Sequence, residues 1–396
     1  MTPLLPGATL GVLGGGQLGR MWSHAAQSLG YRTAVLDPDP HSPAGLVSHV
    51  HVCADYLDPQ GLAQMAAQCQ AITTEFENVP AQALRQLGQT LPCAPGADPV
   101  AVAQDRAREK AHFVACGVPV APHAVLNNAA DVAGVSASLL PGILKTTRMG
   151  YDGKGQVRVA TLADLPAAFE SLQTTGSHTP CILEKRLPLA AECSVVLARS
   201  HDGQIVHLPV QVNLHRDGIL AVTEVFEHVL PKDTEQQAWY AAHAVARSLD
   251  YVGVLCVEFF LLQEGPDRDA LGPLVVNEIA PRPHNSGHHS IDSCDVSQFE
   301  LQVRCMAGLP LVQPRLHSAS VMLNLLGDIW LANGTQAMEP PWASVLALPG
   351  VHLHLYGKTE ARRGRKMGHL TITASSPDTA KQVALQAAQL LDIAAW

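Results

Sequence analysis

The chain has 396 residues, 47% hydrophobic and 15% charged, which is the composition of a globular enzyme rather than a disordered protein. The formal net charge of −9 argues against general binding to nucleic acids or anionic membranes, so an anionic substrate needs a local basic site. The N-terminus lacks the features of a signal peptide, and no apolar run approaches the roughly 20 residues of a membrane span. Nine scattered cysteines without a C-x-x-C pair predict reduced thiols and a cytoplasmic protein.

The start of the chain has the pattern of a doubly wound α/β domain. A short apolar strand at residues 9–13 precedes the turn G-G-G-Q-L-G at 14–19 and a helix through Leu29, and a second strand at 31–36 ends in Asp37. The glycines match G-x-G-x-x-G, and Asp37 lies near the place of an acid that binds the ribose of NAD. An NAD-dependent dehydrogenase is therefore one reading, although any ligand held at a helix N-terminus needs the same small residues.

The alternation of strands and helices continues through the N-terminal third. Glu75 and Glu77 follow a strand, where open α/β sheets place ligand-binding groups; alternatively, they are the N-terminal charges of the next helix. The pattern from residue 100 predicts one helix that ends at Gly117, and the prolines that follow make a hinge toward a second domain. Arg106 on this helix is either a surface charge or a group that reaches a phosphate.

Residues 141–156 combine a strand that carries Lys145 with a loop of three glycines that carries Lys154. Exposed backbone N–H groups and cations in such a loop suit a lid that closes over polyphosphate, and a tight hairpin turn is the alternative. Residues 179–192 follow as a strand and an extended, proline-containing linker. Backbone groups of this linker can hydrogen-bond an adenine edge, and Glu192 can hold ribose hydroxyls.

Two apolar, strand-like runs between residues 254 and 280 each carry a glutamate, Glu258 and Glu278, and a loop at 263–273 joins them. If the strands pair, the two carboxylates face one another, with Asn277 beside the second. Because neighbouring buried carboxylates repel, a divalent cation such as Mg2+ is their natural partner. The alternative is that each glutamate faces solvent on an edge strand.

The C-terminal part contains the only dense basic run of this acidic chain. It comprises Lys358, Arg362, Arg363, Arg365 and Lys366. The run is too short for a nucleic-acid site and lacks interleaved aromatic residues. It is either a solvated loop or a pocket for a small anionic group such as a phosphate.

Taken in chain order, these motifs resemble those of the ATP-grasp superfamily. The resemblance is carried by Lys145, the lid sequence G-Y-D-G-K-G-Q and Glu258. Within this superfamily the chain is most similar to the 5-(carboxyamino)imidazole ribonucleotide synthases of purine biosynthesis. The strings that carry this resemblance are G-G-G-Q-L-G-R-M near the start, N-E-I-A-P-R-P-H-N-S-G-H at 277–288 and R-K-M-G-H at 365–369. A sister family, the formate-dependent glycinamide ribonucleotide transformylases, shares the ATP machinery, but its counterpart of H-N-S-G-H ends in D-T-G.

The resemblance implies an α/β protein with the ATP-grasp fold. The expected parts are an N-terminal doubly wound parallel-sheet domain at 1–120, a small lid domain at 121–190 and a C-terminal α+β ATP-grasp domain at 191–396. It reassigns the glycine turn from NAD to the nucleotide substrate. It also implies a homodimer.

The resemblance further implies three sets of site residues. Those expected to bind ATP are Arg106, Lys145, Gly150, Tyr151, Asp152, Gly153, Lys154, Gly155, Gln156, Glu184, Lys185, Arg186, Leu187, Glu192, His215, Asn277 and Glu278. Those expected to bind aminoimidazole ribonucleotide are Gly16, Gln17, Leu18, Glu75, Tyr151, Asn285, Ser286, His288, Lys358, Arg365 and Lys366. Glu258 and Glu278 are expected to hold Mg2+, and Arg282, His284 and Lys358 to take the catalytic roles.

The implied reaction joins bicarbonate to the exocyclic amine of aminoimidazole ribonucleotide at the expense of ATP. Bicarbonate attacks the γ-phosphate, and the resulting carboxyphosphate delivers CO2 to the amine, which gives N5-carboxyaminoimidazole ribonucleotide, ADP and phosphate. The expected partners are thus small molecules, with no nucleic acid and no membrane. The sister transformylase, the dehydrogenase and a regulatory module that binds ATP without turnover remain alternatives. A zinc site at His284, His288 and His289 is disfavoured, because the neighbouring Arg282 repels a cation.

Overall fold

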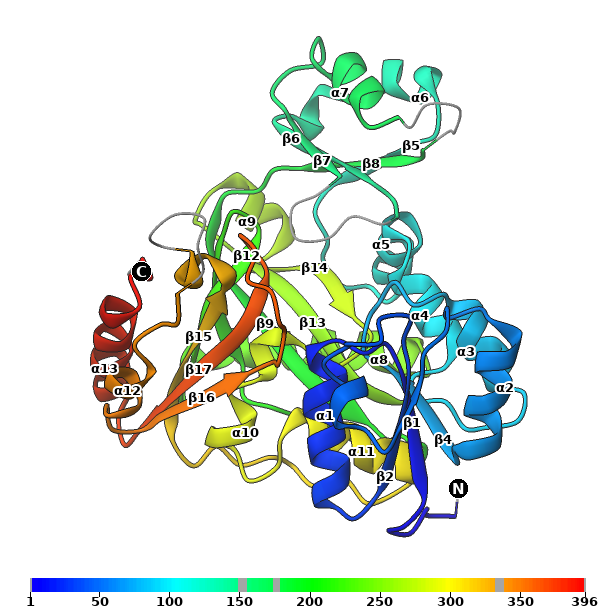
Figure 1. Cartoon of the computed structure of the whole chain (residues 1–396). Helices are drawn as coiled ribbons and strands as arrows, with labels where there is room; N and C mark the ends of the chain where they lie inside the picture. The colour runs from blue at the N-terminus through cyan, green and yellow to red at the C-terminus, as the bar shows by residue number, and fades with distance from the viewer. Residues whose placement is uncertain (1, 149–154, 174–178, 332–337, 395–396) are drawn as a thin grey trace.

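The computed structural model describes residues 2–148, 155–173, 179–331 and 338–394. The predicted lid residues Gly150, Tyr151, Asp152, Gly153 and Lys154 lie outside this part. The described strands form three sheets, two of four strands and one of nine. Figure 1 shows one small sheet in an upper lobe and the other beside the large sheet in the lower body.

The N-terminal sheet is parallel throughout and has the order β3-β2-β1-β4. Its strands are β1 (Thr9–Leu13), β2 (Arg32–Leu36), β3 (Val50–Val52) and β4 (Ala71–Thr74). The helical elements of this segment are α1 (Gln17–Ser28), η1 (Gly45–Val47), α2 (Pro59–Gln68), α3 (Ala81–Leu87) and α4 (Ala97–Ala103). Most residues of β1, β2 and β4 are buried, as expected for a parallel sheet covered by helices, and the predicted doubly wound domain is confirmed.

The single helix predicted from residue 100 to Gly117 is wrong, because the chain forms two helices here, α4 and α5 (Arg106–Ala115). Asp105 interrupts them: its backbone is extended, and its carboxylate accepts hydrogen bonds from the N–H groups of Ala107 and Arg108. Such a capping side chain starts a new helix and ends the preceding one. The break places Arg106 in the first turn of α5, where its N–H donates to the Thr147 carbonyl at 2.8 Å.

The upper lobe is an antiparallel sheet of order β5-β8-β6-β7 covered on one side by short helices (Figure 1). Its strands are β5 (His123–Leu126), β6 (Gly142–Thr146), β7 (Gln156–Val159) and β8 (Cys181–Lys185), and its helical elements are α6 (Ala129–Ala133), η2 (Ala137–Leu139) and α7 (Leu165–Ser171). Leu126, Leu144, Leu183 and Phe169 form its own small hydrophobic core. The lobe therefore holds β6, which carries Lys145, on a separately packed unit.

The body is a nine-stranded antiparallel sheet. Eight strands follow the order β14-β13-β9-β11-β12-β15-β17-β16, and β10 pairs with the last residues of β9. Its strands are β9 (Leu189–Arg199), β10 (Ile205–His207), β11 (Gln211–Arg216), β12 (Ile219–Val225), β13 (Gly253–Leu262), β14 (Leu274–Ala280), β15 (Ala319–Leu326), β16 (Val351–Leu355) and β17 (Lys366–Ala374). The helical elements are α8 (Lys232–Ser248), α9 (Pro266–Leu271), η3 (Asn285–Gly287), α10 (Ser290–Ser293), α11 (Gln298–Ala307), η4 (Gly327–Trp330), α12 (Trp342–Leu346) and α13 (Pro377–Leu390). Figure 1 shows α13 and α12 at one edge of the body and α11 next to the N-terminal helix α1.

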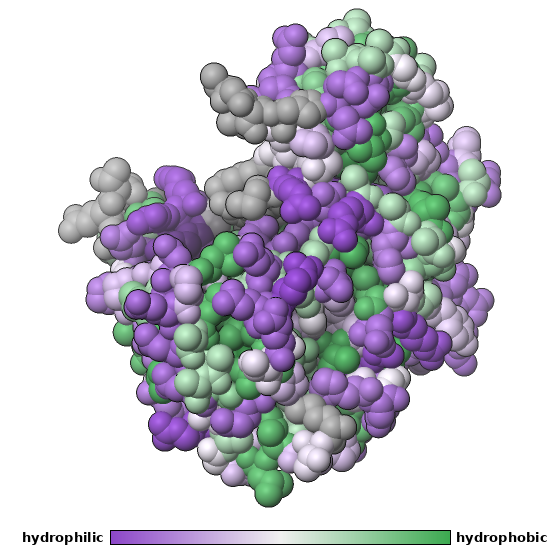
Figure 2. All heavy atoms as spheres, turned by 90° about the vertical axis from the view of Figure 1, so that its right-hand side faces the viewer, coloured by the Kyte–Doolittle hydropathy of each residue, from purple (hydrophilic) through white to green (hydrophobic). Residues whose placement is uncertain are grey.

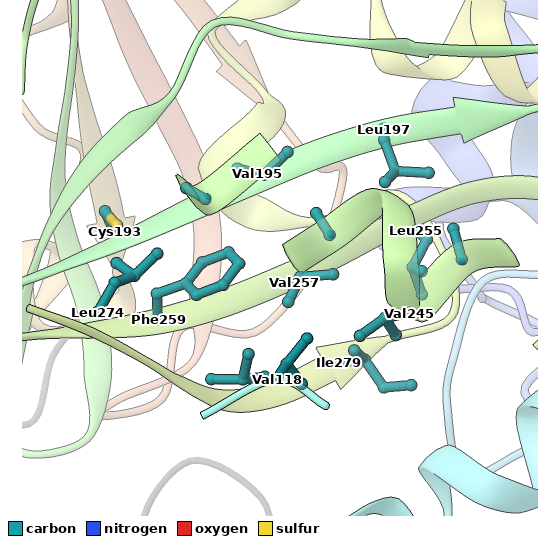
Figure 3. Close-up of a cluster of buried hydrophobic side chains, with 14 of the residues drawn as sticks. Val118, Cys193, Val195, Leu197, Val245, Leu255, Val257, Phe259, Leu274 and Ile279 are labelled. Carbon is teal, nitrogen blue, oxygen red and sulfur yellow. The ribbon is translucent and has the colours of Figure 1, made fainter. Parts of the chain in front are cut away.

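The main core of the body lies between α8 and one face of β9 and β13. Alternate residues of each strand point to the same side, so Val195 and Leu197 of β9 meet Val257 and Phe259 of β13. Figure 3 shows these side chains gathered with Val245 of α8 in one cluster. Each such side chain stabilises the fold by about 1.5–3 kcal/mol relative to exposure, so this core holds β13 rigidly in place.

The two strands that carry the acidic pair are neighbours, as predicted. β13 and β14 pair in antiparallel fashion, with Glu258 directly opposite Glu278 and a register shift just after Glu258. The connection between them contains the short helix α9, which the prediction of a loop missed. Gly265 and Gly272 flank it with positive φ angles of 145° and 87°, a conformation that side chains with a Cβ rarely adopt.

No helix in the four described ranges is long and apolar enough to cross a membrane. All nine cysteines lie in the described part of the chain and are free, and six of them are buried. This agrees with the predicted reduced thiols.

Candidate active site

A cavity of about 940 Å³ lies where the three sheets meet, and most of the predicted site residues line it. The predicted residues on its wall are Gln17, Leu18, Glu75, Arg106, Lys145, Gln156, Glu192, His215, Glu258, Asn277, Glu278, Arg282, His284, Asn285, His288, Lys358, Arg365 and Lys366. Figure 2 shows strongly hydrophilic side chains gathered where the upper lobe approaches the body. Residues from the whole length of the chain therefore converge on one polar space.

Seven described residues of the prediction do not line this cavity. They are Gly16, Gly155, Glu184, Lys185, Arg186, Leu187 and Ser286. Leu187 is buried in a small apolar cluster with Leu262 and Val275, and the Lys185 ammonium pairs with Asp267. The side chains of Lys185 and Leu187 therefore anchor the segment between β8 and β9 rather than face the cavity.

The acidic pair lies on the cavity wall, and each carboxylate contacts a nitrogen of a basic side chain. Glu258 Oε1 is 3.0 Å from His284 Nε2, and Glu278 Oε2 is 2.8 Å from Arg106 Nη1. Burial alone would raise the pKa of Glu258, but His284, His215 and Arg282 outweigh it and lower the pKa to about 2. Glu258 is thus ionised at neutral pH and provides a hard oxygen ligand that faces a second carboxylate.

Arg282 follows β14 and is held in place by an ion pair with Glu77, in the segment after β4. Burial opposes the charged guanidinium, but Glu77 outweighs burial and raises the pKa of Arg282. The pair joins the N-terminal sheet to the body sheet and fixes a positive charge at the cavity wall. The sequence pattern predicted that Glu77 lies among ligand-binding groups at the end of a strand. It did not predict the ion pair, because Arg282 is 205 positions away in the chain.

Two lysines share a buried carboxylate beside the acidic pair. Glu184 at the end of β8 has one oxygen 2.9 Å from Lys145 Nζ and the other 3.7 Å from Lys110 Nζ. Burial would raise the pKa of Glu184, but Lys145 and Lys110 outweigh it and lower the pKa to about 2. Lys110 also donates to the Asn277 carbonyl at 2.6 Å. Glu184 therefore shapes the cavity indirectly, by holding Lys145 at its wall.

Glu109 is a cavity residue that the sequence did not reveal. Its side chain is 2% exposed, and its Oε1 accepts the N–H of Ile279 at 2.8 Å. Burial and the nearby charge of Glu278 raise its pKa to about 8, in spite of Lys110 and Arg106. The signal in the sequence is that Arg106, Glu109 and Lys110 are three and four positions apart and so share one face of α5.

We expect Glu109→Gln to stabilise the protein relative to wild type increasingly as the pH rises from about 4.5 to 8. In this range the folded protein keeps a proton on Glu109 that the unfolded chain has lost, so the stability of the wild type falls with pH. Glutamine keeps the acceptor for Ile279 and removes the titration. The difference should grow by at most about 1.4 kcal/mol per pH unit, as measured by urea unfolding at several pH values. A pH-independent difference would contradict the assignment.

Glu192 and His215 come together on neighbouring strands β9 and β11, with Glu192 Oε2 3.0 Å from His215 Nδ1. Burial disfavours the charged ring, but the adjacent Glu192 carboxylate and the nearby Glu258 and Glu278 outweigh it and raise the pKa of His215. Both side chains line the cavity. The pair is thus well placed to hold the hydroxyl groups of a bound nucleotide.

The glycine turn is filled by the protein itself, which contradicts the dehydrogenase reading. The Glu75 carboxylate accepts the N–H groups of Gly16, Leu18 and Gly19 at 2.9–3.1 Å, at the N-terminus of α1 where a dinucleotide would place its pyrophosphate. A Cβ on Gly16 would lie 2.6 Å from Glu75 Oε1, so the glycine serves this internal contact. The expected ribose acid, Asp37, is likewise engaged, since it accepts the Gly15 N–H at 2.7 Å.

The basic run lies between β16 and β17 and lines the cavity along its whole length from Arg362 to Lys366, together with Lys358. Lys358 Nζ donates to the Lys366 carbonyl at 2.7 Å, which fixes the loop. Close by, the side-chain nitrogen and oxygen of Asn285 are buried and lack a hydrogen-bond partner among the described residues. Because such groups are usually satisfied, Asn285 is positioned for a polar ligand.

The three histidines of the zinc alternative do not converge. His288 Nδ1 lies 3.0 Å from the Gln298 side-chain nitrogen, and His289 Nδ1 lies 2.8 Å from the Ser293 hydroxyl. Burial lowers the pKa values of His288 and His289, to about 3 for His289, so both rings are neutral and packed. The structure gives no support to zinc at these three positions.

Three family models match the chain in succession. They are a ribonucleotide synthetase preATP-grasp domain over residues 7–104, an ATP-grasp domain over 111–299 and a phosphoribosylaminoimidazole carboxylase C-terminal domain over 320–383. The N5-carboxyaminoimidazole ribonucleotide synthase of Brucella melitensis is 41% identical over 373 residues, which cover 93% of this chain and 97% of the relative. The chain belongs to this synthase family.

Solved structures of the synthase family share the fold. The N5-carboxyaminoimidazole synthetase from Staphylococcus aureus complexed with ADP is 35% identical, with a TM-score of 0.86 and 98% of each chain covered. The Aspergillus clavatus synthase in complex with ADP and 5-aminoimidazole ribonucleotide is 29% identical, with a TM-score of 0.85 and coverage of 98% of this chain and all of that one. The predicted ATP-grasp fold is therefore confirmed.

Proposed function

We propose that the cavity carries out in this chain the reaction of its family, the ATP-dependent ligation of bicarbonate to aminoimidazole ribonucleotide. The observation that supports this proposal most strongly is that two groups of positively charged side chains, each suited to a phosphate, line the same cavity. Arg106 and Lys145 lie beside the acidic pair, and the basic run enters from between β16 and β17. Such an arrangement suits two phosphorylated substrates, a nucleoside triphosphate and a ribonucleotide.

The acidic pair fits Mg2+, because both carboxylates and the amide of Asn277 present oxygen ligands on the cavity wall. Glu258 and Glu278 would hold Mg2+, which would supply positive charge to offset that of the ATP phosphates. Arg106 and Lys145 add positive charge on the same side, and Glu192 with His215 would hold the ribose. The described residues thus account for the triphosphate and the sugar of the nucleotide.

Arg282 and His284 follow the metal-binding strand β14 directly, so they reach the region next to the acidic pair. Arg282, fixed by Glu77, would orient bicarbonate for attack on the γ-phosphate and stabilise the carboxyphosphate that results. His284 Nε2 faces the carboxylate of Glu258 and would hold a proton near the reacting oxygens. Lys358 lines the same cavity and would add a positive charge near the labile intermediate.

The ribonucleotide would lie with its 5′-phosphate on Arg365 and Lys366. Asn285, with both polar atoms of its side chain unpartnered among the described residues, would hydrogen-bond the imidazole or its amine. Gln17, Leu18 and Glu75 form the neighbouring wall, although the Glu75 carboxylate already caps α1. In this arrangement the amine of the ribonucleotide would lie near the site of carboxyphosphate formation.

We assign residues 1–120 to the substrate-binding domain, 121–190 to the lid and 191–396 to the ATP-grasp domain with the metal and substrate sites. A homodimer and a cytoplasmic location also belong to the proposal.

Release of ADP from ATP and Mg2+ tests the proposed function. We expect release that requires aminoimidazole ribonucleotide and rises with the bicarbonate concentration. Release triggered instead by glycinamide ribonucleotide with formate would identify the sister transformylase reaction. Binding of ATP without release under either condition would contradict the proposal and favour a regulatory module.

A further inference from the structure

Three side chains of different chemistry converge around Glu258, in the middle of β13. Within the described residues, Cys256, Glu258 and His284 place one ligand atom each within 4.8 Å of the other two. Cys256 and Glu258 are two positions apart on one strand, so they share a face of the sheet. His284 reaches them from the segment after β14, and its Nε2 lies 3.0 Å from Glu258 Oε1.

We propose that Cys256, Glu258 and His284 form a binding site for Zn2+. Thiolate, imidazole and carboxylate are the ligands that Zn2+ takes in tetrahedral sites, and two ligands at about 2.0 Å from the ion lie roughly 3.3 Å apart. The separation of Glu258 and His284 already matches this geometry. Both side chains line the cavity, so the fourth position opens to water or a small anion. Mg2+ prefers oxygen ligands and does not take a thiolate, so the site is selective for a different class of metal.

The surroundings support this ligand set. His284 Nδ1 accepts the backbone N–H of Ser286 at 3.3 Å and lies 2.9 Å from the Ser286 hydroxyl, so Ser286 holds the ring with Nε2 turned toward Glu258. The thiolate of Cys256 and the carboxylate of Glu258 together balance the two charges of the ion, and the guanidinium of Arg282 is already paired with Glu77. Binding replaces the S–H bond of Cys256 by an S–Zn bond and releases that proton to solvent.

The consequence for activity rests on the proposed function. Zn2+ at this site removes Glu258 from Mg2+ and His284 from the reacting oxygens. Excess zinc would therefore inhibit the enzyme by occupying two active-site side chains. Cys256, the third ligand, takes no part in the proposed reaction. Cys256 is fully buried behind Glu258, at the boundary between the cavity and an apolar cluster that includes Val254 and Cys294.

Absorption spectroscopy with Co2+ tests the site without reference to activity. We expect chelator-treated, nucleotide-free protein to bind one Co2+ per chain with visible bands of tetrahedral coordination and a near-ultraviolet thiolate charge-transfer band, all abolished by Zn2+. Cys256→Ser should remove the charge-transfer band and weaken Co2+ binding at least about tenfold. Cys294→Ser, a change at another buried cysteine, is the matched control and should keep the wild-type spectrum. His284→Ala is a second ligand variant, should Cys256→Ser fail to fold.

Absence of the charge-transfer band in wild-type protein, or its persistence in Cys256→Ser, would overturn the proposed site. In the ADP-release assay, we expect Zn2+ to inhibit wild type at concentrations that saturate the spectrum. Cys256→Ala should raise the concentration for half-inhibition at least about tenfold. Zinc binding without inhibition would support the metal site. It would contradict the proposed roles of Glu258 in binding Mg2+ and of His284 near the reacting oxygens.

Discussion

Glu278→Gln should lower the rate of ADP release by about a thousandfold, a loss of roughly 4 kcal/mol of transition-state stabilisation, while the fold survives. The amide keeps the shape of the side chain but loses the negative charge that would hold Mg2+ opposite Glu258. The ion pair with Arg106 is partly exposed, with 20% and 37% of the two side chains accessible, so its loss costs at most about 1 kcal/mol of stability. Steady-state kinetics at saturating Mg2+ and thermal unfolding separate the two effects.

The matched control for this prediction is Glu300→Gln on α11. Glu300 also forms a partly exposed ion pair, at 2.6 Å from Arg304, but it does not line the cavity. We expect this variant to retain wild-type turnover. If Glu278→Gln kept full Mg2+-dependent activity, the metal-binding role of Glu278 would be wrong.

Lys110→Met is expected to destabilise the protein by about 3 kcal/mol and to weaken ATP binding. Lys110 is 1% exposed, and its ammonium contacts the Glu184 carboxylate and the Asn277 carbonyl. Methionine has a similar length and fills the space, but it leaves the carbonyl without a donor and Glu184 with one cation fewer. Removing one partner of a buried ion pair commonly costs about 3–5 kcal/mol, and the remaining contact with Lys145 reduces the effect here. Urea unfolding measures the loss.

Two further variants test the cause of this destabilisation. Arg85→Met removes a cation whose pair with Asp98 is exposed on both sides, and the expected change is within about 0.5 kcal/mol. Adding Glu184→Gln to Lys110→Met should recover part of the lost stability, because the uncompensated carboxylate is then gone. Equal destabilisation by Lys110→Met and Arg85→Met would contradict the buried network.

Local patterns along the chain were sufficient to predict the elements on which the site is built. The apolar runs around Glu258 and Glu278 predicted two adjacent strands with facing carboxylates, and the structure pairs these residues directly. Such predictions succeed because strand pairing between sequence neighbours depends on local alternation and turn residues. The basic run near the C-terminus was likewise visible, since an acidic chain gathers so many cations in one loop only rarely.

The parts that escaped prediction depend on contacts between distant segments. Glu75 caps α1 from 56–59 positions away, which no pattern within either segment reveals. Glu109 and Lys110 look like ordinary helix charges, and only the packing of α5 against β14 buries them. The break at Asp105 was missed because the capping residue lies inside an otherwise continuous helical pattern.

The most direct test of the proposed reaction follows the oxygen of bicarbonate. Bicarbonate labelled with 18O is supplied with ATP, Mg2+ and aminoimidazole ribonucleotide in a short incubation, and the phosphate released is analysed by 31P nuclear magnetic resonance. If bicarbonate attacks the γ-phosphate in this cavity, each turnover transfers one labelled oxygen to phosphate when carboxyphosphate releases CO2. Phosphate that forms with the ribonucleotide but carries no label from bicarbonate would contradict this mechanism.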